Sequence, residues 1–148
     1  MDVFASNGFD YILDANNINV MAVFVAAVLS FVVGGIWYYE GVFGKNWQKL
    51  VGLKKKQIES ANMSVIFGSA FVLALIQALF MSSIMSGLNV RTAFEGLLFG
   101  AVIGSAFAAT AVGIQYLYAQ RKLELYAIDA GYILAQFSVM GLVIGLWQ

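Results

Sequence analysis

The sequence predicts an all-α integral membrane protein, a four-helix bundle with an amphipathic interfacial helix in its first cytoplasmic loop. Of its 148 residues, 61% are hydrophobic and 11% are charged, whereas soluble domains carry about 25% charged residues. Four long apolar stretches follow one another along the chain, each near the roughly 20 residues that cross a bilayer. They lie at about 18–39, 63–85, 94–118 and 125–147. We therefore expect residues 18–148 to form a single four-span transmembrane domain.

The first 17 residues form a separate acidic segment. They contain three aspartates and no lysine or arginine, and residues 9–13 are mostly apolar and aromatic. Such an apolar cluster favours a segment lying on the membrane surface over a solvated tail. We expect an extracytoplasmic interfacial segment at 1–17.

The loop at 40–62 contains the interfacial helix. Its apolar residues between 42 and 51 recur at helical spacing, Lys45 and Lys49 share the opposite face, and Gly52 is a suitable terminator. A basic run follows at 54–56. Contact with anionic lipid headgroups is one interpretation and a solvated charge run is the other. The expected headgroup contacts are Lys45, Lys49, Lys54, Lys55 and Lys56.

Small residues recur every four positions in all four spans. In the third span they are Gly96, Gly100, Gly104 and Ala108, and the fourth span contains Gly131. Residues four apart share one helix face, and small faces allow helix backbones to approach closely in lipid. We expect these five residues to be helix-packing positions and the third span to be the central, most closely packed helix.

The distribution of lysine and arginine predicts the orientation. The loop after the first span has five lysines and the loop after the third has Arg121 and Lys122, whereas the link between the second and third spans has only Arg91. Basic loops stay in the cytoplasm. With four spans, both termini are then extracytoplasmic. We expect a multi-pass protein of a cell inner membrane.

Asp129 is the candidate site residue, because an ionisable group inside a span is costly and usually faces the bundle interior. Lys45, Arg121 or a tyrosine hydroxyl could pair with it. One interpretation is a proton, cation or ligand-headgroup site; the other is a carboxylate in the first helical turn, stabilised by the helix dipole. The expected polar and aromatic cluster consists of Asp129, Trp37, Tyr38, Lys45, Trp47, Tyr132 and Arg121.

Other polar features indicate packing more than chemistry. Gln77 and Gln136 lie deep in the second and fourth spans and could hydrogen-bond to each other. The stretch Gly35-Ile36-Trp37-Tyr38 is echoed by Gly113-Ile114-Gln115-Tyr116, an agreement we attribute to chance.

Several function classes are disfavoured by what the sequence lacks. It contains no cysteine and no histidine, which removes thiolate chemistry, the usual general base and the commonest metal ligand. It also has no phosphate-binding loop and no nucleophile–base pair. We expect a protein that is not an enzyme, has no metal or cofactor, and does not bind nucleic acid.

Three short stretches resemble a known family. They are Gly34-Gly35-Ile36-Trp37-Tyr38, Phe43-Gly44-Lys45-Asn46-Trp47 and Ile128-Asp129-Ala130-Gly131-Tyr132. Together they are similar to the pattern of a bacterial family of small four-span membrane proteins of unknown function, over about residues 19–148. The resemblance implies topology and no particular activity.

Two functional hypotheses follow. The number of small-residue faces favours a protein that acts by assembly, as a homo-oligomer or as a small subunit of a larger membrane complex. The alternative is a small ion or solute transporter with a site around Asp129.

Overall fold

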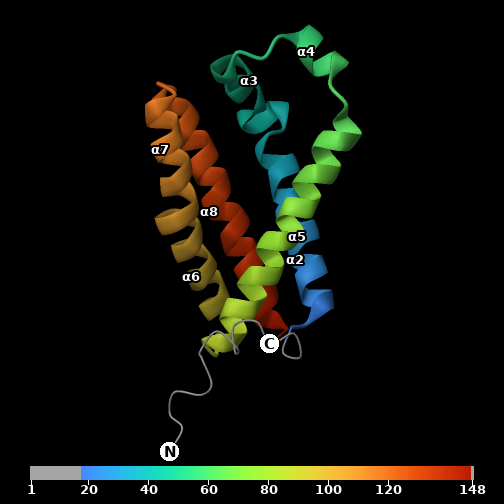
Figure 1. Ribbon diagram of the computed structural model, residues 1–148, viewed down its shortest axis with the longest axis vertical. Coiled ribbons are helices and arrows are strands. Elements are labelled where there is room, and N and C mark those ends of the chain that lie inside the picture. The colour runs from blue at the N-terminus through green and yellow to red at the C-terminus, as the bar shows by residue number, and fades with distance from the viewer. Residues whose placement is uncertain (1–17, 148) are drawn as a thin grey trace, which may run out of the picture.

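The computed structural model describes residues 18–147, and within them the chain forms helices and turns with no strand. The expected segment at 1–17 lies outside the described residues. Four helical paths are long and apolar enough to cross a membrane (Figure 1). They are α2 (Val20–Trp37), α5 (Met63–Gly87), the combined path Ala93–Tyr118, and α8 (Leu123–Leu146). The all-α membrane bundle is confirmed.

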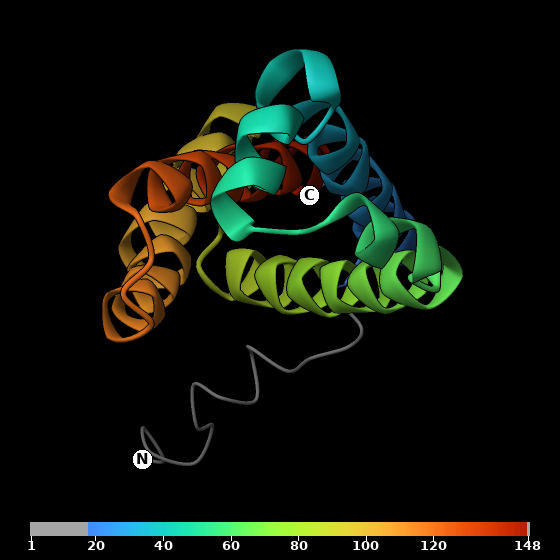
Figure 2. The ribbon, with the colours of Figure 1, turned by 90° about the horizontal axis from the view of Figure 1, so that it is seen from above.

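The central helix is α8. It packs against α6 (Ala93–Ile103) on one side and against α2 on the other, and α2 also packs against α5 (Figure 2). The expectation that the third span is central is therefore wrong. The physical reason is that α8 has two buried faces: Gly141 and Gly145 meet the third span, whereas Met140 and Ile144 enter the core shared with α2 and α5.

The glycines of the third span lie in its contact with α8. A Cβ atom added at Gly100 would overlap the carbonyl oxygen of Phe137, and one added at Gly96 would overlap the carbonyl oxygen of Gly141. At Gly104 the added atom would lie 3.0 Å from the Phe137 Cβ. The backbones of α6 and α8 thus approach as closely as glycine permits, in the way that small-residue faces allow in membranes.

The small faces of the other spans are also used inside the chain. Ala26 and Ser30 of α2 are fully buried, as are Ala78 and Ser82 of α5. They surround a core of larger side chains: Val23, Met81, Met85, Phe137, Met140, Val143 and Ile144. These small residues let three helices pack around that core.

The third span is not one continuous α-helix as expected. Between α6 and α7 (Thr110–Tyr118) lies η3 (Gly104–Ala109), a π-helical segment. Within it the Ser105 hydroxyl donates to the Ala101 carbonyl oxygen at 2.7 Å, and just after it the Thr110 hydroxyl donates to Ala106 at 2.7 Å. Such side-chain bonds compete with the backbone ladder and accompany local unwinding.

The loop at 40–62 forms two short helices above a π-helical turn, η2 (Glu40–Gly44). The expected helix at 42–51 is represented by α3 (Lys45–Val51), which ends where Gly52 adopts a left-handed conformation with φ of 82°. A second helix, α4 (Lys55–Ser60), contains part of the basic run. Both lie at the same end of the bundle as the α7–α8 turn, and the last turn of α8 lies at the other end (Figure 1).

Candidate functional site

Asp129 lies inside α8, more deeply than its first turn. Because α8 begins at Leu123, Asp129 is the seventh residue of the helix, and the first-turn carboxylate is that of Glu124. The side chain of Asp129 is buried, with 8% of its surface exposed. The helix dipole acts mainly within the first turn. The interpretation of Asp129 as a first-turn residue is therefore wrong.

Two tyrosines bind the two carboxylate oxygens of Asp129. The Tyr38 hydroxyl donates to Oδ1 at 2.7 Å, and the Tyr116 hydroxyl donates to Oδ2 at 2.5 Å. Tyr38 directly follows α2 and Tyr116 belongs to α7, so the carboxylate joins three of the four spans.

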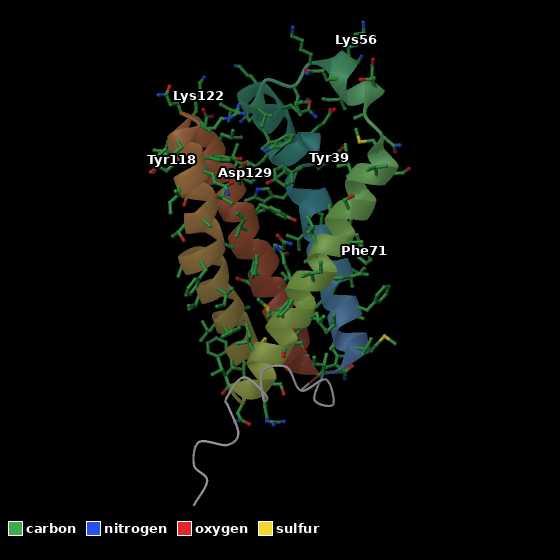
Figure 3. The ribbon with its side chains drawn as sticks, viewed as in Figure 1. Tyr39, Lys56, Phe71, Tyr118, Lys122 and Asp129 are labelled. Atoms are coloured by element: carbon green, nitrogen blue, oxygen red, sulfur yellow. The ribbon has the colours of Figure 1, made fainter. Side chains whose placement is uncertain are left out.

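No basic side chain pairs with this carboxylate. Within residues 18–147 the structure contains one ion pair, between Lys55 and Glu59. Lys45 and Arg121 are exposed, so neither is the partner of Asp129. Figure 3 shows Asp129 inside the bundle, below the level of Lys122 at the end of the helices. Long basic side chains keep their charge in the headgroup layer, whereas a tyrosine reaches inward without desolvating a charge.

Trp37 covers the neighbouring turn of α8. Its indole Nε1 donates to the Ile128 carbonyl oxygen at 3.0 Å, and its ring packs against Phe43 with the centroids 4.9 Å apart and the planes tilted by 34°. Gly131 makes this placement possible, because a Cβ there would lie 2.8 Å from Trp37 Cζ2. Gly131 therefore contacts the Trp37 side chain. The hydrogen bond from the Trp37 indole to the α8 backbone joins α2 to α8, in addition to the bond made by Tyr38.

Trp47 and Tyr132 hold the ring of Tyr38. The centroid of Tyr38 lies 5.3 Å from that of Trp47 and 5.1 Å from that of Tyr132, and the ring planes meet at 64° and 63° in edge-to-face arrangements. Tyr132 itself packs on Gly34, where an added Cβ would lie 3.1 Å from the hydroxyl oxygen. Edge-to-face pairs of this kind favour one ring orientation. They therefore hold in place the Tyr38 hydroxyl, which donates to Asp129.

The two deep glutamines form a hydrogen bond further along the same core. Gln136 Nε2 donates to Gln77 Oε1 at 3.0 Å, and Gln136 is buried. Gln136 is seven residues after Asp129 on α8, which places it on the same helix face about 10.5 Å away. Polar groups from α5 and α8 thus lie below the Asp129 cluster, towards the C-terminal end of α8.

Two cavities flank the cluster. A small one of about 250 Å³ is lined by Trp37, Phe43, Asn46, Glu124, Ala127 and Ile128. A larger one of about 1130 Å³ lies between α2, α5 and the helices of the 40–62 loop, and Tyr38, Trp47 and Tyr132 are part of its wall. The aromatic cluster therefore separates the Asp129 carboxylate from the larger cavity.

Tyr116 is the site residue that sequence reasoning did not select. Its signal was the echo between the two stretches that end in Tyr38 and Tyr116. Both final tyrosines donate to Asp129, so the echo marks equivalent places at the ends of two spans.

A metal centre is not evident. Within residues 18–147 no three acidic, histidine or cysteine side chains come together. The two tyrosine hydroxyls hold the Asp129 carboxylate between neutral donors. Each carboxylate oxygen can accept more than one hydrogen bond, so the carboxylate can still accept others.

Comparison with known proteins identifies the family of the chain. A search of curated proteins and a search of solved structures each returned no match. A family model matches residues 21–145, which include the Asp129 cluster and all of the four spans except the first residue of α2 and the last of α8. The chain therefore belongs to the DUF1761 family, a family of proteins of unknown function.

Proposed function

We propose that the protein is a small transporter of protons or monovalent cations, without enzymatic activity, and that Asp129 is its binding group. The observation that carries the proposal is the Asp129 carboxylate, buried in a span and held by the two hydroxyls of Tyr38 and Tyr116. Ionisable side chains within spans are rare and mark ion pathways and proton relays.

The missing basic partner supports this proposal. A structural carboxylate inside a membrane protein is usually neutralised by a lysine or arginine, since an unpaired buried charge is costly. Here the partners within the described residues are tyrosines. Two neutral donors stabilise the anion by about 1.5–3 kcal/mol each and leave its charge uncompensated. A proton or a cation can supply that compensation.

Polar groups lie on either side of Asp129. Glu124 and Asn46 line the small cavity next to Ile128, at the basic end of the bundle. On the other side follow the Gln77–Gln136 pair and then Ser83, whose buried hydroxyl has no hydrogen-bond partner in the described part of the chain. These groups support a polar route along α8 and α5 through a core that is otherwise apolar.

Flux into reconstituted vesicles tests the proposal. Asp129→Asn keeps the size of the side chain and removes its charge. We expect it to lower proton or monovalent cation flux at least tenfold, while circular dichroism and thermal unfolding show an intact fold. Glu59→Gln is the control, because it removes an exposed carboxylate from α4, outside the four spans and the proposed route. Equal flux through both variants and the unmodified protein, or no flux of any monovalent cation or proton, contradicts the proposal.

Assembly is the second candidate function, as a homo-oligomer or as a subunit of a larger membrane complex. The small faces of α2, α8 and the third span support it less than the sequence suggested, because they are used inside the chain. The first part of α5 favours it: residues 63–70 are all exposed, and Gly68 has no atom within 4 Å of an added Cβ. Native mass spectrometry in lipid nanodiscs would give a dimer or higher oligomer if this face binds a second copy.

We also propose a bacterial inner membrane as the location, with both termini extracytoplasmic. The support is that Lys56 and Lys122 lie at the same end of the bundle (Figure 3), and Lys54 and Lys55 directly precede Lys56 in the chain. Basic residues of short loops stay on the cytoplasmic side.

A further inference from the structure

We propose that the larger cavity is a binding site for one anionic phospholipid, with an acyl chain between α2 and α5 and the headgroup at the basic run Lys54 to Lys56. This inference goes beyond the proposed transport function and does not depend on it.

The size and lining of the cavity fit a lipid chain. Its volume of about 1130 Å³ slightly exceeds the roughly 300–1,000 Å³ of ordinary small-molecule pockets. The wall is mainly apolar, and several wall residues are exposed on the surface of the bundle: Ile36 by 62%, Ile66 by 50% and Phe67 by 55%. These residues belong to spans, so the cavity is bordered by surface that contacts the hydrocarbon layer. A lipid chain can enter from there without crossing water.

Trp47 supplies an unused hydrogen-bond donor in the wall. Its ring packs on Tyr38, and its Nε1 atom is buried with no hydrogen-bond partner among residues 18–147. A buried indole N–H normally finds an acceptor, and leaving one unpaired costs about 1–3 kcal/mol. The ester and phosphate oxygens of a phospholipid lie at the membrane interface, where tryptophan is commonly found. One such oxygen would accept a hydrogen bond from the Trp47 Nε1–H.

Positive charge lies next to the cavity at the matching end. Leu53, Gln57 and Ile58 are part of the wall, and the three lysines between Leu53 and Gln57 are all exposed. Only Lys55 is in an ion pair, with Glu59, among the described residues. Lysines near an anionic surface contribute attraction to its headgroups. The cavity therefore has apolar walls ending in a cationic rim, which is the chemistry of an anionic amphiphile.

The test is lipid retention in native mass spectrometry. The full chain is placed in nanodiscs that contain equal amounts of phosphatidylglycerol and phosphatidylcholine, and is then released for measurement. We expect one retained phosphatidylglycerol, preferred at least tenfold over phosphatidylcholine. Replacing the three lysines by glutamine should remove that preference. Inorganic phosphate at millimolar concentration should not displace the lipid, since the acyl chain contributes to binding.

Two variants address the cavity itself. Gly35 lines it and has no atom within 4 Å of an added Cβ, so Gly35→Phe should fill the cavity and lower retention about tenfold. Gly68 is equally open but is not part of the wall, so Gly68→Phe is the matched control and should retain lipid as before. Trp47→Phe keeps the ring, removes the donor and should weaken retention severalfold.

Three outcomes overturn the inference. The first is unchanged retention in both Gly35→Phe and Trp47→Phe. The second is equal retention of the two lipids by the unmodified protein. The third is a lipid-free dimer in which a second copy covers α5.

Discussion

The contact between α6 and α8 predicts a graded loss of stability when methyl groups are added to its glycines. In Gly100→Ala the new Cβ would overlap the carbonyl oxygen of Phe137 and would lie 2.7 Å from the carbonyl carbon. Both are backbone atoms, so relief requires a shift of the helices. Overpacking of this kind costs about 1–3 kcal/mol, against a gain of about 0.5–1 kcal/mol when alanine replaces a helical glycine. We expect a net loss of roughly 1–2 kcal/mol.

Comparison variants make this prediction specific. In Gly104→Ala the nearest atoms are the Phe137 Cβ at 3.0 Å and the Ile133 carbonyl oxygen at 3.2 Å, so the overlap is milder than at Gly100 and the loss should be smaller. Gly68→Ala has no atom within 4 Å and should leave stability unchanged or raise it slightly. The assay is unfolding in mixed micelles with increasing denaturing detergent, followed by circular dichroism. Equal stability of Gly100→Ala and Gly68→Ala would refute the close backbone contact.

Three further predictions concern the core and the orientation. Gln136→Leu should lower stability by about 1 kcal/mol in the same assay, because Gln77 loses its partner, and Gln77→Leu in the same chain should recover part of this loss. Tyr116→Phe should cost about 1.5 kcal/mol, because Asp129 loses one of its two donors; an unchanged unfolding midpoint would contradict that bond. Cysteines introduced at Ser60 and at Leu88 should react differently with an impermeant thiol reagent in intact cells, with only position 88 labelled.

The fold was predictable from the sequence because span length, the four-residue spacing of small residues and the basic character of loops can all be read from composition and residue spacing. The centre of the bundle was not. A single glycine face, such as that of the third span, shows that a helix has one close neighbour, whereas centrality requires two buried faces. Those of α8 consist of Met140 and Ile144 on one side and Gly141 on the other, and large apolar residues in a membrane helix can face either lipid or protein.

For the candidate site, the sequence identified the carboxylate and most of its aromatic neighbours but not its pairing. Asp129 stood out because it is charged within a span. Its donors could not be chosen, because Lys45, Arg121 and several tyrosines lie at the same level along the spans. The structure distinguishes them by depth and reach: the basic side chains remain exposed, and Tyr38 and Tyr116 point inward. The start of α8 at Leu123 further placed Asp129 beyond the first turn.

Infrared difference spectroscopy of the protein in a membrane film tests most directly whether Asp129 takes up a proton or cation. The spectrum is compared as the buffer alternates between high and low concentrations of the transported ion. We expect a carboxyl-group difference band in the unmodified protein and in Glu59→Gln, and its loss in Asp129→Asn. A band that persists unchanged in Asp129→Asn would contradict the assignment of Asp129 as the binding group.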